Sequence, residues 1–189
     1  MTASGQQYLR NAIHLATGAL APAVLAWPRF WAVGLAGTML AVALTADVCR
    51  RRPAGRALLD RRLPGVFRPG ETGRPSGATL LAAGYLVAVL ALPAEAAAAG
   101  ILALAVGDPA AAVAGRWYGR RVGTAGKTWL GSVACCLAAA LAMWPLPSLD
   151  LAAAAAGGAM AALVERRAGT LDNLVLPLLT GLLVSLWIR

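Results

Sequence analysis

The sequence contains few charged residues, and the kinds of charge are unevenly represented. Only 13% of its 189 residues are charged, whereas 59% are hydrophobic, and the mean hydropathy is +0.68. Eight residues are acidic, one is a histidine and one of the seventeen basic residues is a lysine. Soluble domains carry about 25% charged residues. The composition therefore predicts an integral membrane protein and excludes a large soluble catalytic domain.

The few cysteines and the lone histidine exclude two further kinds of site. Cys135 and Cys136 are adjacent in an apolar run and Cys49 ends another, a pattern that predicts no disulfide framework. His14 cannot anchor a metal cluster by itself. It shares a predicted helix face with Arg10, so it is a candidate site residue whose alternative is a packed or interfacial role.

Apolar segments dominate the chain, and seven of them approach the roughly 17 to 25 residues that a membrane-spanning helix needs. They cover residues 11–27, 30–48, 77–93, 94–113, 130–146, 149–164 and 172–188. The first has no clear cleavage site after it and is expected to remain as a helix. The sequence thus predicts an all-α fold, with residues 1–189 forming one domain of about seven transmembrane helices.

Basic residues cluster in three of the predicted connections. Residues 50–74 contain eight arginines, and further basic residues occur in 115–128 and 165–171. The positive-inside rule places these connections and the amino terminus in the cytoplasm, with the site facing the cytoplasm. Anionic lipid headgroups and topology account for the net charge of +9, so no nucleic-acid partner is expected. The irregular segment 49–76 is expected to lie along the membrane surface.

Asp108 is the first candidate for chemistry. It follows about 14 apolar residues, which rise only about 21 Å, so it is expected to lie below the cytoplasmic interface. Pro109 cannot donate to the carbonyl of Ala105, and a carboxylate beside a free carbonyl suits Mg²⁺. The alternative is that Asp108 caps a new helix while Gly107, Ala111 and Gly115 form a packing stripe.

Lys127 is the second candidate because it is the only lysine in a chain that otherwise uses arginine. A compact ammonium group in Gly126-Lys127-Thr128 indicates a point charge placed on a phosphate. The alternative is an ordinary flanking cation. A phosphate-binding P-loop is excluded because Arg121 occupies the position of its first glycine.

The start of the last apolar segment is the third candidate. Asp172 and Asn173 lie there, and Pro177 leaves the carbonyl of Asn173 without its helical donor. A carboxylate, an amide and a free carbonyl would therefore gather at the same membrane face as Asp108 and Lys127. The alternative is that Asp172 only caps the helix.

These motifs together resemble the CTP-dependent polyprenol kinase family, which includes dolichol kinase, phytol kinase and CTP-dependent diacylglycerol kinase. The resemblance rests on GDPAAAVAGRWYGRR at 107–121, GKTWLGS at 126–132, ERRAGTLDNLVLPL at 165–178 and RNAIH at 10–14. It implies transfer of a phosphoryl group from CTP, with Mg²⁺, to a membrane lipid alcohol such as a polyprenol, phytol or diacylglycerol.

The resemblance also implies a nucleotide and metal site. Within that site we infer the individual roles: Asp108 and Asp172 would hold the metal and, with Lys127, would be catalytic. The residues expected around the nucleotide are Gly107, Gly115, Arg116, Gly119, Lys127, Thr128, Gly131, Ser132 and Asn173, and Glu165 and Pro177 would complete the site.

Two departures from the family pattern keep alternatives open. Leu130 stands where the family has a glutamate, and Asn11 replaces a lysine. A phosphatidate cytidylyltransferase that makes a CDP-lipid is one alternative, although its usual carboxyl-terminal Pro-Gly-His-Gly-Gly segment is not present. A lipid carrier without catalytic activity, or an inactive relative, is the other.

Overall fold

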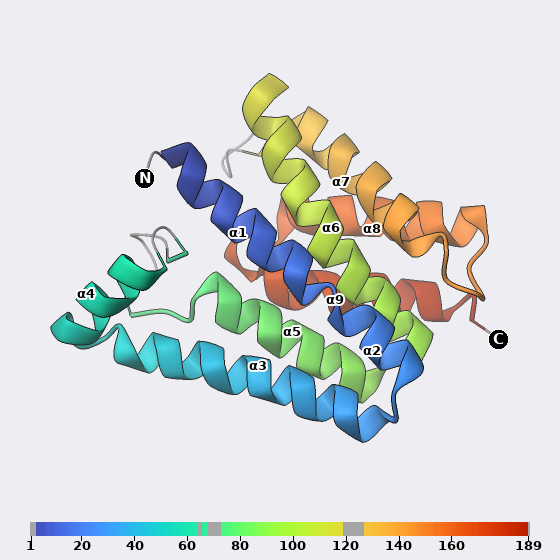
Figure 1. Ribbon diagram of the computed structural model, residues 1–189. Coiled ribbons are helices and arrows are strands. Elements are labelled where there is room, and N and C mark those ends of the chain that lie inside the picture. Colours follow the sequence, from blue (N-terminus) through green and yellow to red (C-terminus); the bar gives the residue numbers. More distant parts are fainter. Residues whose placement is uncertain (1–2, 64–65, 68–72, 119–126, 189) are drawn as a thin grey trace.

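The computed structural model describes residues 3–63, 66–67, 73–118 and 127–188, which form a bundle of helices (Figure 1). This part of the chain is helical, as the sequence predicts. Its elements are α1 (Ala3–Thr17), α2 (Leu20–Ala26), α3 (Arg29–Cys49), α4 (Pro53–Arg62), α5 (Gly77–Ala91), α6 (Ala94–Tyr118), α7 (Trp129–Met143), α8 (Leu151–Arg167), the 3-10 turn η2 (Gly169–Leu171) and α9 (Asp172–Ser185).

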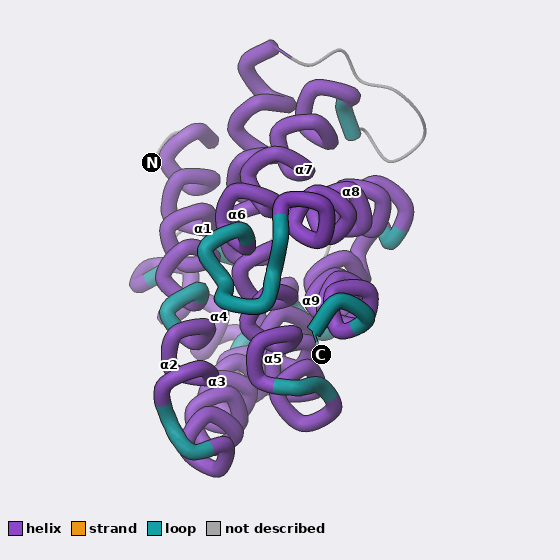
Figure 2. The backbone as a smooth tube through the Cα atoms, turned by 90° about the vertical axis from the view of Figure 1, so that its right-hand side faces the viewer, coloured by secondary structure: helices purple, strands orange, loops and turns teal. Residues whose placement is uncertain are grey.

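Helix α6 is the centre of the bundle. It contacts α1, α2, α5, α7, α8 and α9, and Figure 2 shows it surrounded by them. Residues 96–99 are four consecutive alanines with no exposed surface. Because alanine side chains are small, neighbouring helices approach the backbone of α6 from several directions.

Two glycines allow α5 and α6 to pack closely against the start of α9. A Cβ atom on Gly100 would lie 2.0 Å from the carbonyl oxygen of Pro177, and one on Gly84 would lie 2.7 Å from that of Asn173. No side chain fits at these separations. The position of Asn173, and of Asp172 beside it, is therefore fixed by backbone contacts with two other helices.

The prediction of one continuous helix over residues 11–27 is wrong, because α1 ends at Thr17 and α2 begins at Leu20. Thr17 Oγ1 donates to the carbonyl of His14 at 2.7 Å. A Cβ atom on Gly18 would lie only 2.9 Å from Cβ of Ala105 in α6. The break therefore occurs where glycine permits a close approach to the central helix.

The segment 49–76 is more regular than the sequence predicts, since it contains α4. Pro53 is at the start of this helix, where its missing amide hydrogen costs nothing. Asp47, in the last turn of α3, accepts hydrogen bonds from the amide of Ser76 and from Thr79 Oγ1, both at 2.8 Å. This buried carboxylate joins the end of α3 to the start of α5.

Two described helices are long and apolar enough to cross a membrane. They are α3, over Arg29–Cys49, and α6, over Ala94–Trp117, while the apolar helices Gly77–Ala91, Trp129–Met143 and Gly169–Ser185 are shorter. Helix α3 exposes apolar side chains along its length, with Trp31 59% and Val42 65% exposed. The fold is therefore compatible with a membrane protein, with two candidate spans in this part of the chain.

Candidate active site

The helix ends that carry the sequence candidates gather at one end of the bundle. In Figure 1 the first turns of α1, α5 and α7 and the last turns of α3 and α6 lie toward the left and top. This arrangement follows from short connections between antiparallel helices, which return the chain to the same end at every second crossing. Residues far apart in the sequence, such as His14 and Asp172, can then share one site.

Lys127 lies between two carboxylates at this end. Its Nζ atom is 2.5 Å from Oε1 of Glu165 and 3.3 Å from Oδ2 of Asp172. The lysine precedes α7, Glu165 is near the end of α8 and Asp172 begins α9. The exposed fractions of the side chains are 25% for Lys127, 5% for Glu165 and 16% for Asp172. The only lysine of the chain is thus held by both acids.

The charges of this cluster act on one another. Burial by itself would lower the pKa of Lys127, but the hydrogen bond to Glu165 and the charges of Glu165, Asp172 and Asp108 outweigh it and raise that pKa. The pKa of Glu165 is raised, chiefly because the side chain is buried. The contact with Lys127 opposes this shift, and the negative charges of Asp108 and Asp172 add to it. Lys127 is therefore charged at neutral pH; its ammonium group contacts two carboxylates and is within the electrostatic influence of a third, Asp108.

Asp108 approaches this cluster from α6 and also faces α1. His14 Nδ1 is 3.6 Å from Asp108 Oδ2. The two side chains form an ion pair when the imidazole is protonated. Helix α6 continues through Asp108 and Pro109 to Tyr118. The alternative in which Asp108 caps a new helix is therefore wrong.

The small-residue stripe on α6 packs against the start of α7. A Cβ atom on Gly107 would lie 3.0 Å from Cys135 Sγ, and one on Gly115 would lie 2.8 Å from Thr128 Oγ1. A Cβ atom on Gly131, in α7 itself, would also lie 2.8 Å from Thr128 Oγ1. These glycines are needed for helix packing whether or not a nucleotide binds beside them.

Thr128 and Ser132 stabilise the first turn of α7. Thr128 Oγ1 accepts a hydrogen bond from the amide of Gly131 at 3.0 Å, and Ser132 Oγ donates to the carbonyl of Thr128 at 3.3 Å. The threonine is therefore the N-cap of α7. This cap fixes the direction in which the chain leaves Lys127.

The remaining sequence candidates are placed differently. Asn173 Nδ2 donates to the carbonyl of Gly77 at 3.0 Å, which ties α9 to α5. The guanidinium of Arg116 lies 5.6 Å from the ring centre of Tyr8 in α1, and Leu130 is 41% exposed on the first turn of α7. Gly119 lies outside the described residues.

An apolar cavity adjoins the cluster, and sequence reasoning did not anticipate it. Its volume is about 760 Å³, and α1, α3, α5 and the start of α9 contribute its walls. Most of its lining is apolar, such as Val42 and Leu81, but His14, Asp172 and Asn173 also line it. Asp172 therefore belongs both to the Lys127 cluster and to the wall of an apolar cavity.

The fit of a divalent cation to these residues is partial. Oε2 of Glu165 is buried and has no hydrogen-bond partner among the described residues, as expected of an oxygen that could take a cation. No group of three acidic, histidine or cysteine side chains in the described ranges could hold a metal by itself. Mg²⁺ usually binds through one or two carboxylates, with phosphates and water as its other ligands, so the site suits a metal that arrives with a nucleotide.

Comparisons with known proteins give no relative for this chain: no family model, no curated protein and no solved structure matches it. The function is therefore inferred from the residues and their geometry.

Proposed function

We propose that this chain is a CTP-dependent kinase that phosphorylates the hydroxyl group of a membrane lipid alcohol. The observation that carries the proposal is the position of Asp172, which contacts Lys127 and lines the apolar cavity. A cation suited to phosphate thus lies beside a space suited to a lipid chain. A polyprenol, a phytol-like alcohol or a diacylglycerol fits this description.

Phosphoryl transfer needs positioning and charge neutralisation more than covalent help from the protein. In the proposed step the lipid hydroxyl oxygen bonds to the γ-phosphorus of CTP, while the bond from that phosphorus to the β,γ-bridging oxygen breaks and CDP leaves. The hydroxyl proton passes to His14, which lines the cavity. Asp108 beside it stabilises the resulting imidazolium. Lys127 neutralises phosphate charge.

Asp108 and Asp172 would hold Mg²⁺ delivered with the nucleotide, and Glu165 keeps Lys127 in place between them. When bound, the ion neutralises charge on the β- and γ-phosphates. Each carboxylate has two oxygens, so Asp108 can face both His14 and the metal. The cluster has one ammonium for three carboxylates, so a divalent cation would balance the remaining negative charge.

We propose further that the chain crosses the cytoplasmic membrane in about seven segments with its amino terminus and its site in the cytoplasm. The broken pair α1 and α2 would form the first crossing. The apolar cavity between α1, α3 and α5 would then open to the bilayer, and the acceptor would enter sideways. CTP would reach Lys127 from the cytoplasm.

A cysteine at Thr170 tests this sidedness. Thr170 is exposed beside Asp172, in the turn between α8 and α9. In a background without the three native cysteines, it should react with a membrane-impermeant thiol reagent only after cells are opened. Labelling from outside intact cells would invert the topology and place the site away from CTP.

The replacement Leu130→Glu should increase phosphoryl transfer. Leu130 is exposed, so a glutamate there requires no repacking, and it lies three residues after Lys127 in the first turn of α7. An added carboxylate can then reach a metal bound at the phosphates. The rate is measured on monodisperse protein, with Leu130→Gln as the uncharged control. Equal rates for wild type and Leu130→Glu would show that this position is not a missing catalytic group.

The decisive experiment supplies γ-labelled CTP and Mg²⁺ to the purified protein with polyprenol, phytol and diacylglycerol in separate reactions. Labelled lipid phosphate and CDP are the expected products. A fourth reaction contains phosphatidic acid, which already has the phosphate that a CDP-lipid needs; a CDP-lipid with labelled pyrophosphate from this reaction would indicate a cytidylyltransferase instead. No nucleotide turnover with any of these lipids would favour a carrier or an inactive relative.

A further inference from the structure

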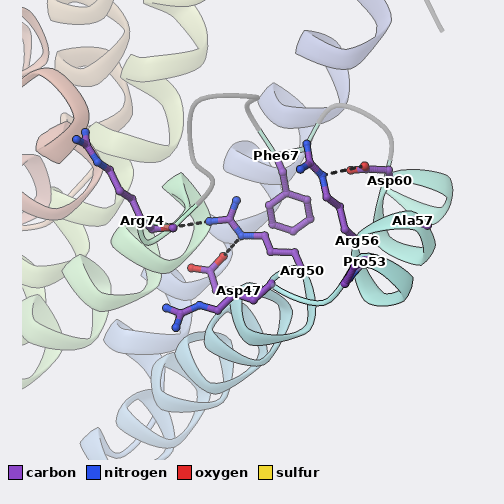
Figure 3. Close-up of a pocket in the computed structure, with 10 residues that line it drawn as sticks. Asp47, Arg50, Pro53, Arg56, Ala57, Asp60, Phe67 and Arg74 are labelled. Atoms are coloured by element: carbon purple, nitrogen blue, oxygen red, sulfur yellow. Dashed lines mark hydrogen bonds and ion pairs between the residues drawn. The ribbon is translucent and has the colours of Figure 1, made fainter.

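A second pocket lies where α3 meets α4, apart from the Lys127 cluster (Figure 3). Its volume is about 420 Å³. We call it the arginine pocket, because its lining includes Arg50, Arg51, Arg56 and Arg74. Asp47 and Asp60 are the acidic residues of the described walls. Figure 3 shows the side chain of Arg74 pointing away from Phe67, while its carbonyl accepts from Arg50. The other three arginines and the two acids give the pocket a net charge of +1.

Arg50 is held in place before any ligand arrives. Its Nε atom is 2.9 Å from Oδ1 of Asp47, and both side chains are about nine-tenths buried. Its Nη2 atom donates to the carbonyl of Arg74 at 2.6 Å, and its guanidinium lies 5.2 Å from the ring centre of Phe67. Because Asp47 is also bonded to Ser76 and Thr79, this part of the pocket is rigid.

Arg51 and Arg56 supply the charge that remains available. Figure 3 shows Arg56 extending from α4 toward Phe67. It pairs with Asp60 at 3.7 Å, but both side chains are more than half exposed, and such pairs are weak. Arg51 makes no ion pair within the described ranges. Both line the arginine pocket, so an anion entering it can contact either arginine without breaking a strong contact.

The arginine pocket and the apolar cavity share two wall residues, Phe67 and Arg74. A ligand with an anionic head and an apolar chain could occupy both spaces at once. Leu58 on α4 is 57% exposed, as expected for a helix at a membrane surface. A free phosphate ion would gain nothing from contact with the apolar cavity, whereas a lipid would bury its chain there. The two adjoining spaces therefore favour a lipid.

We propose that the arginine pocket binds the phosphate group of an anionic membrane lipid whose acyl chain extends along the apolar cavity. Guanidinium groups suit this headgroup because they donate parallel hydrogen bonds to phosphate oxygens. This proposal does not depend on kinase activity. It is tested without CTP.

The test measures binding of a short-chain phosphatidic acid to the full-length protein in detergent by calorimetry, at physiological salt. Arg51→Gln/Arg56→Gln should weaken binding by roughly tenfold or more. Arg61→Gln/Arg62→Gln is the matched control. Both arginines are exposed on α4, the helix that also contains Arg56, and neither lines the arginine pocket. This control should change binding by less than about threefold, since salt screens general surface attraction.

Equal weakening by both pairs would overturn the proposal in favour of general surface charge. Two competitors identify the ligand: a triacylglycerol of the same chain length, which has neither a phosphate nor a free hydroxyl group, should bind much more weakly, and a large excess of inorganic phosphate should not displace the lipid. Displacement by phosphate alone would overturn the lipid assignment. If the glutamine pair does not fold, Arg51→Lys/Arg56→Lys replaces it, and unchanged binding in that variant would overturn the guanidinium contact.

Discussion

Replacing Lys127 with methionine should abolish phosphoryl transfer and lower the free energy of unfolding by about 2–4 kcal/mol. The stability loss arises because Glu165, only 5% exposed, and Asp172 would face each other without their shared cation. Denaturant unfolding in detergent measures the stability, and labelled CTP measures the transfer.

A change at Glu165, which contacts Lys127, provides the control for the loss of stability. Lys127→Met combined with Glu165→Gln removes one of the two stranded charges, so it should recover part of the lost stability but none of the activity. Lys127→Arg should keep most of the stability and still lower the rate, because a planar fork replaces a compact charge. A fully stable Lys127→Met protein would show that the ion pairs contribute nothing. Normal turnover by it would remove Lys127 from the mechanism.

Asp108→Asn should reduce turnover by roughly 10²–10³-fold or more while the protein remains folded. The amide keeps the shape of the side chain, and α6 continues through this position without relying on a cap. The change removes the charge beside His14 and one proposed oxygen ligand of Mg²⁺. Rates measured over a range of Mg²⁺ concentrations should show that the variant needs more Mg²⁺ for half-maximal activity and that its maximal rate is lower.

Asp150→Asn is the matched control for that variant. Asp150 caps α8 through a hydrogen bond from the amide of Ala153, and asparagine caps helices equally well. It should therefore lose the same charge with little change in rate. Wild-type turnover of Asp108→Asn at low Mg²⁺ would rule out the metal role of Asp108.

The sequence predicted the helical class and much of the membership of the cluster. Apolar segments of near-spanning length alternate with short connections, so polar helix ends had to recur at the same end of the bundle. The alternation of apolar segments and short connections predicts that Lys127 and Asp172 lie close together, although they are 45 positions apart in the sequence. It also anticipated that Gly107 and Gly115 would form a packing stripe, which the close approach to α7 confirms.

What the sequence did not predict depends on packing between distant elements. The pairing of Lys127 with Glu165 requires the relative rotation of α7 and α8, which no local pattern encodes. The apolar cavity is a gap between α1, α3 and α5, so it has no signature in any one of them. The break at Gly18 was missed because the residue it accommodates, Ala105, is far away in the sequence.

The fixing of α9 against α5 and α6 has a consequence for biosynthesis. Pro177 packs against Gly100 of α6, and Asn173 packs against Gly84 of α5. The faces of α5 and α6 that contain these glycines therefore have no partner until the ribosome has made α9. Asp172 enters at the same moment. A nascent chain that stops before this helix would leave Lys127 with one acid and the cavity without part of its wall. Assembly of the cluster therefore depends on the synthesis of α9, and a chain without this helix would lack part of the proposed site.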